Sequence, residues 1–284
     1  MKTVVITGAT SGIGYAAAKA LAAEGMRVIG TGRTPRTCAD AKAALLDELP
    51  NADIVFFSGD LSSQSDVNAI ADEILNVMGD MPVTALINNA GGVRSKFTQT
   101  PDGCEYQFAL NHLAGFLLTH RLWNLIVKGG GRLIMTGSRS HMNTAVHWSD
   151  IMYKKRYSCL FAYKQSKLCN VLFARELMRR FERSGVNAYV VDPGLVKTDI
   201  GNKKTGGVVN AFWSIRKRYG EAPETVADTY LYLVKQNPAP KGLYYKARLN
   251  TKYNSRADSI DDAKRLFELS EALCGIKFGN PSYI

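Results

Sequence analysis

The chain has 284 residues, of which 46% are hydrophobic, enough apolar material for one large α/β domain. No apolar run approaches the ~20 residues that a bilayer-spanning helix needs. The formal net charge of +11 would suit nucleic acid, an anionic membrane surface or an acidic small molecule, but the basic residues are scattered and form no basic-aromatic repeat. We therefore expect a solvated basic surface and no nucleic-acid partner.

The chain opens with a β-branched strand pattern at residues 2–7, a glycine-rich turn at 8–14 and a helix pattern at 15–24. Glycines allow a tight turn and a close approach of the backbone to a ligand. The first N–H groups of the helix and its positive dipole end would face the turn, which suits a pyrophosphate. This arrangement predicts a dinucleotide site that contains Gly8, Thr10, Ser11, Gly12, Ile13 and Gly14.

The second strand pattern, at residues 26–31, ends where dinucleotide folds select their cofactor. An acidic residue there binds the adenosine ribose hydroxyls, whereas an arginine accommodates a 2′-phosphate. This chain has Arg33 and Arg36 at that point and no carboxylate before Asp40. The pattern favours NADP(H) as the cofactor, with Arg33 as the phosphate ligand. The alternative is that Arg33 is an ordinary surface arginine.

The third and fourth strand patterns, at residues 53–58 and 83–87, are each followed by candidate cofactor ligands. Asp60, before Leu61, could accept a hydrogen bond from an adenine amino group, or it could cap the helix expected at 62–78. After the fourth strand, small residues and amides would let the cofactor pass while the amides tie neighbouring strands together. These positions are Asn88, Asn89, Ala90, Gly91 and Gly92.

A long helix is expected at about 102–127, and it places Asn111 in an apolar stretch. A polar residue there is costly unless it is hydrogen-bonded. Asn111 could therefore be a buried amide that binds backbone, or it could hold a water in a proton relay. The fifth strand, at 132–136, precedes Ser138, whose hydroxyl could bond a substrate oxygen; Ser140 is a competitor for that role.

Tyr163 and Lys167 are four residues apart in a helix expected at about 157–182, so their side chains share one face. A phenol ordinarily titrates near ~10, and an adjacent ammonium favours the phenolate and lowers that pKa. The pair could exchange a proton with a carbonyl or alcohol oxygen. Tyrosine and lysine also occur at this spacing by chance, so the pair gains meaning only from the rest of the chain.

The rest of the chain completes an alternation of strands and helices. A sixth strand is expected at 186–191, a helix at 223–235, a last short strand at 242–245 and a helix near 260–274. The alternation predicts one doubly wound Rossmann-type α/β domain over residues 1–284, with about seven parallel strands and helices on both faces. Glycines and apolar residues at about 195–222 suggest a substrate-binding lid, and about 246–284 form a C-terminal extension.

The cysteines and the N-terminus bear on the cellular compartment. The five cysteines are odd in number and never spaced C-x-x-C, and the four histidines include no H-E-x-x-H. The chain begins directly with a strand pattern and leaves no room for a signal peptide. We expect reduced thiols, no metal site and a cytoplasmic protein.

Together these motifs resemble the short-chain dehydrogenase/reductase family over nearly the whole chain. Residues 110–113 and 162–177 are similar to its retinol dehydrogenase-like branch; light-dependent protochlorophyllide reductases are a weaker match. Gly137, Ala114–Gly115 and Asp192 depart from the usual pattern. We expect no N-terminal membrane anchor of the kind found in many retinol dehydrogenases.

The resemblance implies a role for each site residue. Tyr163 is the acid/base, Lys167 lowers its pKa and binds the nicotinamide ribose, Ser138 polarises the substrate oxygen, and Asn111 holds a water that links Lys167 to solvent. It adds Pro193, Gly194, Val196 and Thr198 to the cofactor ligands.

The expected function is NADPH-dependent interconversion of a carbonyl and an alcohol on a largely apolar small molecule. Alternatives are reduction of a conjugated C=C bond and a non-catalytic NADP-binding sensor. The chain is compatible with a homodimer or a homotetramer.

Overall fold

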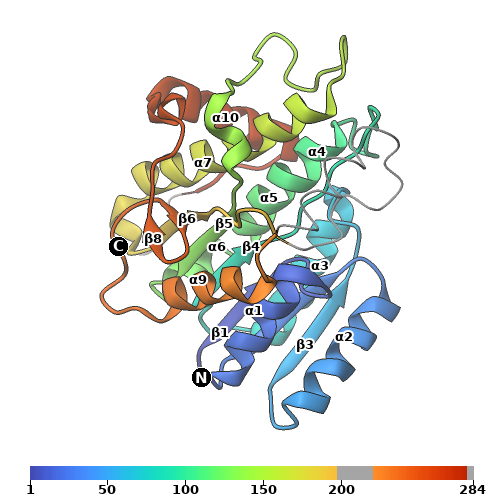
Figure 1. Ribbon diagram of the computed structural model, residues 1–284, viewed down its shortest axis with the longest axis vertical. Helices are drawn as coiled ribbons and strands as arrows, with labels where there is room; N and C mark the ends of the chain where they lie inside the picture. The colour runs from blue at the N-terminus through green and yellow to red at the C-terminus, as the bar shows by residue number, and fades with distance from the viewer. Residues whose placement is uncertain (197–219, 280–284) are drawn as a thin grey trace.

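The computed structural model describes residues 1–196 and 220–279 (Figure 1). Thr198 and nearly all of the segment expected to form a lid lie outside the described residues. The strands that are described form one sheet in the order β3-β2-β1-β4-β5-β6-β7-β8. Their bounds are β1 Thr3–Ile6, β2 Arg27–Gly32, β3 Ile54–Ser58, β4 Ala85–Asn88, β5 Arg132–Thr136, β6 Asn187–Val191, β7 Tyr244–Lys246 and β8 Leu249–Asn250.

The first seven strands are parallel, which confirms the predicted doubly wound sheet. The two-residue strand β8 runs antiparallel to β7 and was not predicted. The strand order reverses between β1 and β4, because the chain crosses back from β3 to pair beside β1. In an open α/β sheet, ligands bind outside the carboxyl ends of the strands at such a reversal.

Helices cover both faces of the sheet. One face carries α1 (Gly12–Ala23), α2 (Pro35–Glu48) and α9 (Pro223–Lys235), and α1 packs against α9 (Figure 1). The other face carries α3 (Gln64–Met78), α5 (Ala114–Arg121), α6 (Trp123–Lys128), α7 (Cys159–Arg180) and α10 (Ile260–Cys274). Each face buries its own apolar cluster, which explains why the central strands read as continuous apolar runs.

The helix predicted at about 102–127 is borne out over most of residues 106–128, but it is divided into several elements. The structure has a short helix α4 (Tyr106–Phe108), a π-helical turn (Ala109–Leu113), α5 and α6 in its place. The π turn puts one extra residue into the helix, so its backbone carbonyls no longer all bond along the helix. The main-chain carbonyl of Asn111 accepts from the Asn170 amide on α7 at 3.0 Å. A neighbouring helix therefore completes the bonding of the turn.

The C-terminal extension packs onto the main domain. Helix α10 begins at the cap Ser259, whose hydroxyl accepts from the backbone N–H of Asp262, and lies against α7. Phe278 beyond it contacts a cluster of rings on both α5 and α10, with ring centroids 5.2 Å from Phe116 and 5.1 Å from Phe267.

All five cysteines are free thiols. Within residues 1–196 and 220–279, no helix is both long and apolar enough to cross a bilayer. Across the same residues, no group of three or more His, Cys, Asp or Glu side chains is placed to hold a metal ion.

Candidate active site

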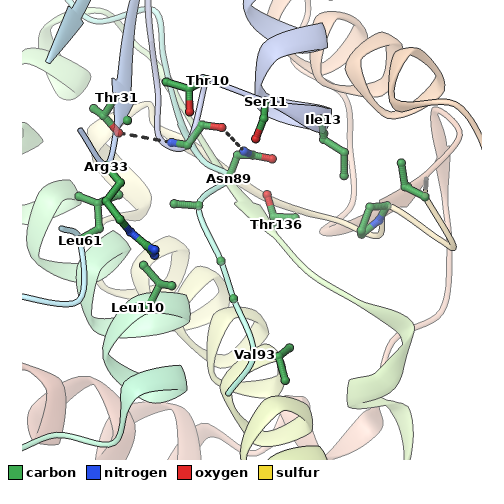
Figure 2. Close-up of a pocket in the computed structure, with 18 of the residues that line it drawn as sticks. Thr10, Ser11, Ile13, Thr31, Arg33, Leu61, Asn89, Val93, Leu110 and Thr136 are labelled. Carbon is green, nitrogen blue, oxygen red and sulfur yellow. Dashed lines mark hydrogen bonds between the residues drawn. The ribbon is translucent and has the colours of Figure 1, made fainter. Parts of the chain in front are cut away.

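A cleft of about 470 Å³ opens at the carboxyl edge of the sheet (Figure 2). Its walls come from the segments that follow six strands, together with side chains from α4, the π turn and α7. These residues are Gly8, Thr10, Ser11, Gly12, Ile13, Thr31, Gly32, Arg33, Gly59, Asp60, Leu61, Asn89, Ala90, Gly91, Gly92, Val93, Arg94, Tyr106, Leu110, Thr136, Gly137, Tyr163, Lys167, Pro193, Gly194 and Val196. Of the predicted cofactor ligands that the structure describes, all but Gly14 line this cleft.

The glycine turn is built for close approach. Gly8 and Gly12 have φ of +66° and +55°, where residues with a side chain are strained. A Cβ on Gly14 would lie 2.2 Å from the Gly8 carbonyl oxygen, so Gly14 lets α1 pack onto the turn without itself lining the cleft. The N-cap Ser11 makes no side-chain hydrogen bond to the first turn of α1. The first backbone N–H groups of α1 are therefore available to an anion in the cleft.

The amides after β4 tie neighbouring strands together, as predicted. Asn89 donates to the carbonyls of Thr7 at 3.0 Å and Gly8 at 3.3 Å, and Gly8 N–H donates to the Thr31 hydroxyl at 3.3 Å (Figure 2). The backbone N–H of Ala90 donates to the Thr7 hydroxyl at 2.9 Å. These bonds fix the turn after β1 against the segment after β4.

Asp60 lines the cleft and does not cap α3. Its Oδ1 accepts from the backbone N–H of Ser62 at 2.9 Å and from the Ser62 hydroxyl at 2.8 Å. Ser63 is the N-cap of α3, and its hydroxyl accepts from the N–H of Asp66. The local turn therefore orients Asp60, and its contact with adenine stays a prediction.

Arg33 is exposed, but its guanidinium bonds a residue on the opposite wall of the cleft. Its Nη2 donates to the Tyr106 hydroxyl at 3.1 Å, a bond that spans the cleft from the end of β2 to α4. Figure 2 shows its side chain extending from the end of β2 toward Leu110. Tyr106, Arg94 and Leu110 line the same end of the cleft and were missed as site residues, because no local motif marks them.

Tyr163 and Lys167 both line the cleft from α7, one helical turn apart. The Lys167 ammonium lies 5.8 Å from the centre of the Tyr163 ring. Lys167 is buried, and its Nζ donates to the main-chain carbonyl of Thr136 at 3.0 Å. The structure thus brings the predicted acid/base pair together at the end of β5.

Ser138 follows β5 and is buried behind the wall of the cleft. Its hydroxyl oxygen accepts from the Ser140 hydroxyl at 3.0 Å and from the Ser140 N–H at 3.3 Å. Ser140 therefore bonds Ser138 in this structure. The sequence alone left open whether Ser140 would take the place of Ser138 at the substrate oxygen. His141 holds the same segment, since its Nδ1 lies 2.7 Å from the Ser138 carbonyl oxygen and Asn254 N–H donates to its Nε2 at 3.2 Å.

Asn111 is buried behind Gly91 and Gly92 and does not line the cleft. Its Oδ1 accepts from Gly92 N–H at 2.8 Å, and its Nδ2 donates to the Ser166 hydroxyl at 3.0 Å. A Cβ added to Gly91 would lie 3.1 Å from Asn111 Oδ1 and 3.5 Å from Lys167 Nζ. Asn111 and Lys167 thus flank the same glycine, and both the oxygen and the nitrogen of the Asn111 side-chain amide bond protein groups.

Comparisons with known proteins identify the family. The short chain dehydrogenase family model matches residues 2–207. Retinol dehydrogenase 12 of Mus musculus is 32% identical over 280 residues, which cover 98% of this chain and 87% of the relative.

Solved structures share the fold. A putative uncharacterized protein from Mycobacterium paratuberculosis superposes with a TM-score of 0.74 at 29% identity, with 99% of this chain and 96% of that chain covered. A short chain dehydrogenase/reductase from Burkholderia phymatum in complex with NAD has a TM-score of 0.69 at 17% identity, with 100% and 98% covered.

Proposed function

The chain belongs to the short-chain dehydrogenase family, in its retinol dehydrogenase-like branch, and we propose that it interconverts a carbonyl and an alcohol on a largely apolar small molecule with NADP(H). One observation carries the proposal: Tyr163 and Lys167 line the same cleft as the glycine turn and the free first turn of α1. This arrangement supports the proposal, because hydride transfer to a carbonyl requires a proton donor and a dinucleotide in one cavity.

The cleft fits the dinucleotide. Gly8 and Gly12, with φ of +66° and +55°, line the cleft without side chains and leave room for a pyrophosphate against the N–H groups of α1, while Gly14 lets that helix pack onto the turn. Asp60 and Leu61 would hold the adenine, Arg33 the 2′-phosphate, and Pro193, Gly194 and Val196 the nicotinamide end. Thr198 was also predicted to bind the cofactor and lies outside the described residues. When bound, the nicotinamide supplies or accepts the hydride.

The protein's own groups would move the proton and orient the substrate. Tyr163 donates a proton to the carbonyl oxygen in reduction or removes it from the alcohol in oxidation. Lys167 favours the phenolate of Tyr163 by its charge and binds the nicotinamide ribose. Ser138, whose hydroxyl oxygen accepts from Ser140, would donate its own hydroxyl hydrogen to the substrate oxygen. Asn111 would hold the Gly91–Gly92 segment beside Lys167, and its role as a water ligand stays a prediction.

Activity against a substrate panel tests the reaction. Oxidation of NADPH and NADH is measured with ketones, aldehydes and conjugated alkenes, including long apolar aldehydes because the relative is named a retinol dehydrogenase. Turnover of carbonyls supports the proposal, whereas turnover of alkenes alone favours reduction of a C=C bond. Cofactor binding with no turnover of any member favours a sensor.

A pair of tyrosine variants assigns the acid/base. Tyr163→Phe removes only the transferable proton, so kcat should fall by about 10²–10⁴-fold while NADPH affinity stays near the wild-type value. Tyr232→Phe serves as the control, because it also removes a phenol hydroxyl, but from α9 on the opposite face of the sheet. Activity of Tyr163→Phe within a few-fold of the wild type would remove Tyr163 from the mechanism.

A further inference from the structure

Two arginines approach one tyrosine at the adenosine end of the cleft. Arg33 donates to the Tyr106 hydroxyl at 3.1 Å, and the Arg94 guanidinium lies 4.6 Å from the centre of the Tyr106 ring. Tyr106 is only 6% exposed, so its ring is a fixed platform between the two cations. All three side chains line the cleft. The three residues come from three separate segments, after β2, after β4 and on α4.

The charge of this cluster is not neutralised by nearby carboxylates. Neither Arg33 nor Arg94 forms an ion pair within residues 1–196 and 220–279. Glu105, beside Tyr106, is buried, and its two oxygens accept from Phe108 N–H at 2.7 Å and from the Tyr157 hydroxyl at 3.0 Å. The pair of guanidinium groups is therefore available to a bound anion.

Arg94 also carries an unused donor. Its Nε is buried and has no hydrogen-bond partner among the described residues. A buried donor without a partner costs free energy, and a charged donor costs more than a neutral one. A ligand oxygen that reached this part of the cleft would remove that cost, and an anionic oxygen would bind it most strongly.

We propose that Arg94 is a second determinant of cofactor choice, which binds the 2′-phosphate of NADP(H) together with Arg33. Tyr106 positions both cations: its hydroxyl holds Arg33 and its ring supports Arg94. Two guanidinium groups supply enough N–H donors for the three oxygens of one phosphate ester. This inference rests on the proposed function, because it assigns a further part of the same cofactor site.

Binding of cofactor fragments tests this proposal without a measurement of turnover. Binding of 2′,5′-ADP and of 5′-AMP is measured by calorimetry for the wild type and for Arg94→Met, Arg33→Met, Tyr106→Phe and Arg36→Met. Arg94→Met should weaken 2′,5′-ADP by about tenfold, the size expected for loss of one charge-assisted hydrogen bond, and leave 5′-AMP within about twofold. Tyr106→Phe should weaken 2′,5′-ADP by a few-fold, since Arg33 loses its acceptor.

Arg36→Met is the matched control. Arg36 lies three residues from Arg33, has a side chain that is 91% exposed, pairs with Asp40 at 3.9 Å and does not line the cleft. Its loss should change both affinities by less than about twofold. If Arg36→Met and Arg94→Met lose the same affinity for 2′,5′-ADP, the effect of Arg94 comes from long-range charge alone, and the inference is overturned. Equal losses of 2′,5′-ADP and 5′-AMP in Arg94→Met, with a lowered Tm, would mean a structural role and would also overturn it.

The outcomes keep the two proposals apart. If the wild type prefers 2′,5′-ADP, Arg33→Met removes the preference and Arg94→Met retains it, the role of Arg94 is wrong and the NADP(H) assignment stands. If the wild type binds 2′,5′-ADP no more tightly than 5′-AMP, the NADP(H) assignment itself is wrong, and the role of Arg94 is wrong with it.

Discussion

Acid should destabilise the folded chain through His112, the residue after Asn111 in the π turn. His112 is completely buried, and its ring nitrogens lie 2.9 Å from the Ser270 hydroxyl on α10 and 3.4 Å from Asn170 Oδ1 on α7. Burial lowers the pKa of His112 from 6.5 to about 4, and this outweighs the hydrogen bond to Asn170. The imidazole is thus neutral in the folded chain near neutral pH.

The sign follows from proton linkage. The unfolded chain binds a proton at His112 below about pH 6.5, whereas the folded chain does so only near pH 4. Stability from this group is therefore fully present above pH 6.5 and is lost as the pH falls toward 4. The loss of stability begins near pH 6.5, so between pH 7.5 and pH 5 it extends over roughly 1.5 pH units. At about 1.4 kcal/mol per pH unit this lowers the free energy of unfolding by about 2 kcal/mol.

Urea unfolding at pH 7.5 and pH 5 measures this loss. His112→Gln cannot titrate, so the fall in its free energy of unfolding should be about 2 kcal/mol smaller than that of the wild type. The matched control is His147→Gln, which makes the same substitution at an exposed histidine. Equal falls in the wild type and His112→Gln would refute the reasoning that burial keeps this imidazole neutral.

Two further predictions concern the cleft. In the direction of alcohol oxidation, where Tyr163 would act as the base, Lys167→Met should lower kcat and move the rising limb of the pH–rate profile to higher pH, because the ammonium that would favour the phenolate is gone. Lys164→Met on the same helix is the control, and an unmoved profile would argue against the pairing. Gly14→Ala should weaken binding of both NADPH and NADH and lower the Tm, because its Cβ would lie 2.2 Å from the Gly8 carbonyl oxygen. Gly279→Ala is its control, because a Cβ at Gly279 would have no described atom within 4 Å. Unchanged cofactor affinity in Gly14→Ala would count against the role of the turn.

The sequence predicted the frame of the site because that frame is local. A strand, a glycine turn and a helix are contiguous, and Tyr163 and Lys167 share a face by helical spacing alone. The alternation of strands and helices then places all strand ends at one edge of the sheet, which brings the separate motifs into one cleft. The sheet and the gathering of most predicted cofactor ligands in one cleft could therefore be predicted without coordinates.

The parts that were missed depend on contacts between distant segments. Arg33 and Tyr106 are 73 residues apart, and no spacing rule links them. The sequence does not predict the π turn around Asn111, because the apolar pattern of that stretch also fits a straight helix. The Asn170 amide that bonds the Asn111 carbonyl lies on α7, a distant segment of the chain. The bond from Ser140 to Ser138 depends on the turn after β5, which the pattern of residues leaves open.

Thr136 shows how such contacts support the chemistry. Its carbonyl accepts from Lys167 at 3.0 Å and from Asn170 at 3.3 Å, while its hydroxyl lies 2.7 Å from the buried Tyr230 hydroxyl on α9. One strand residue therefore joins α7 on one face of the sheet to α9 on the other. Because Asn170 also binds the Asn111 carbonyl, the position of the Lys167 ammonium is set jointly by β5, α7 and the π turn. The position of the Lys167 ammonium thus depends on the packed sheet as well as on helical spacing, and a change at Asn170, which does not line the cleft, should reach the predicted acid/base pair.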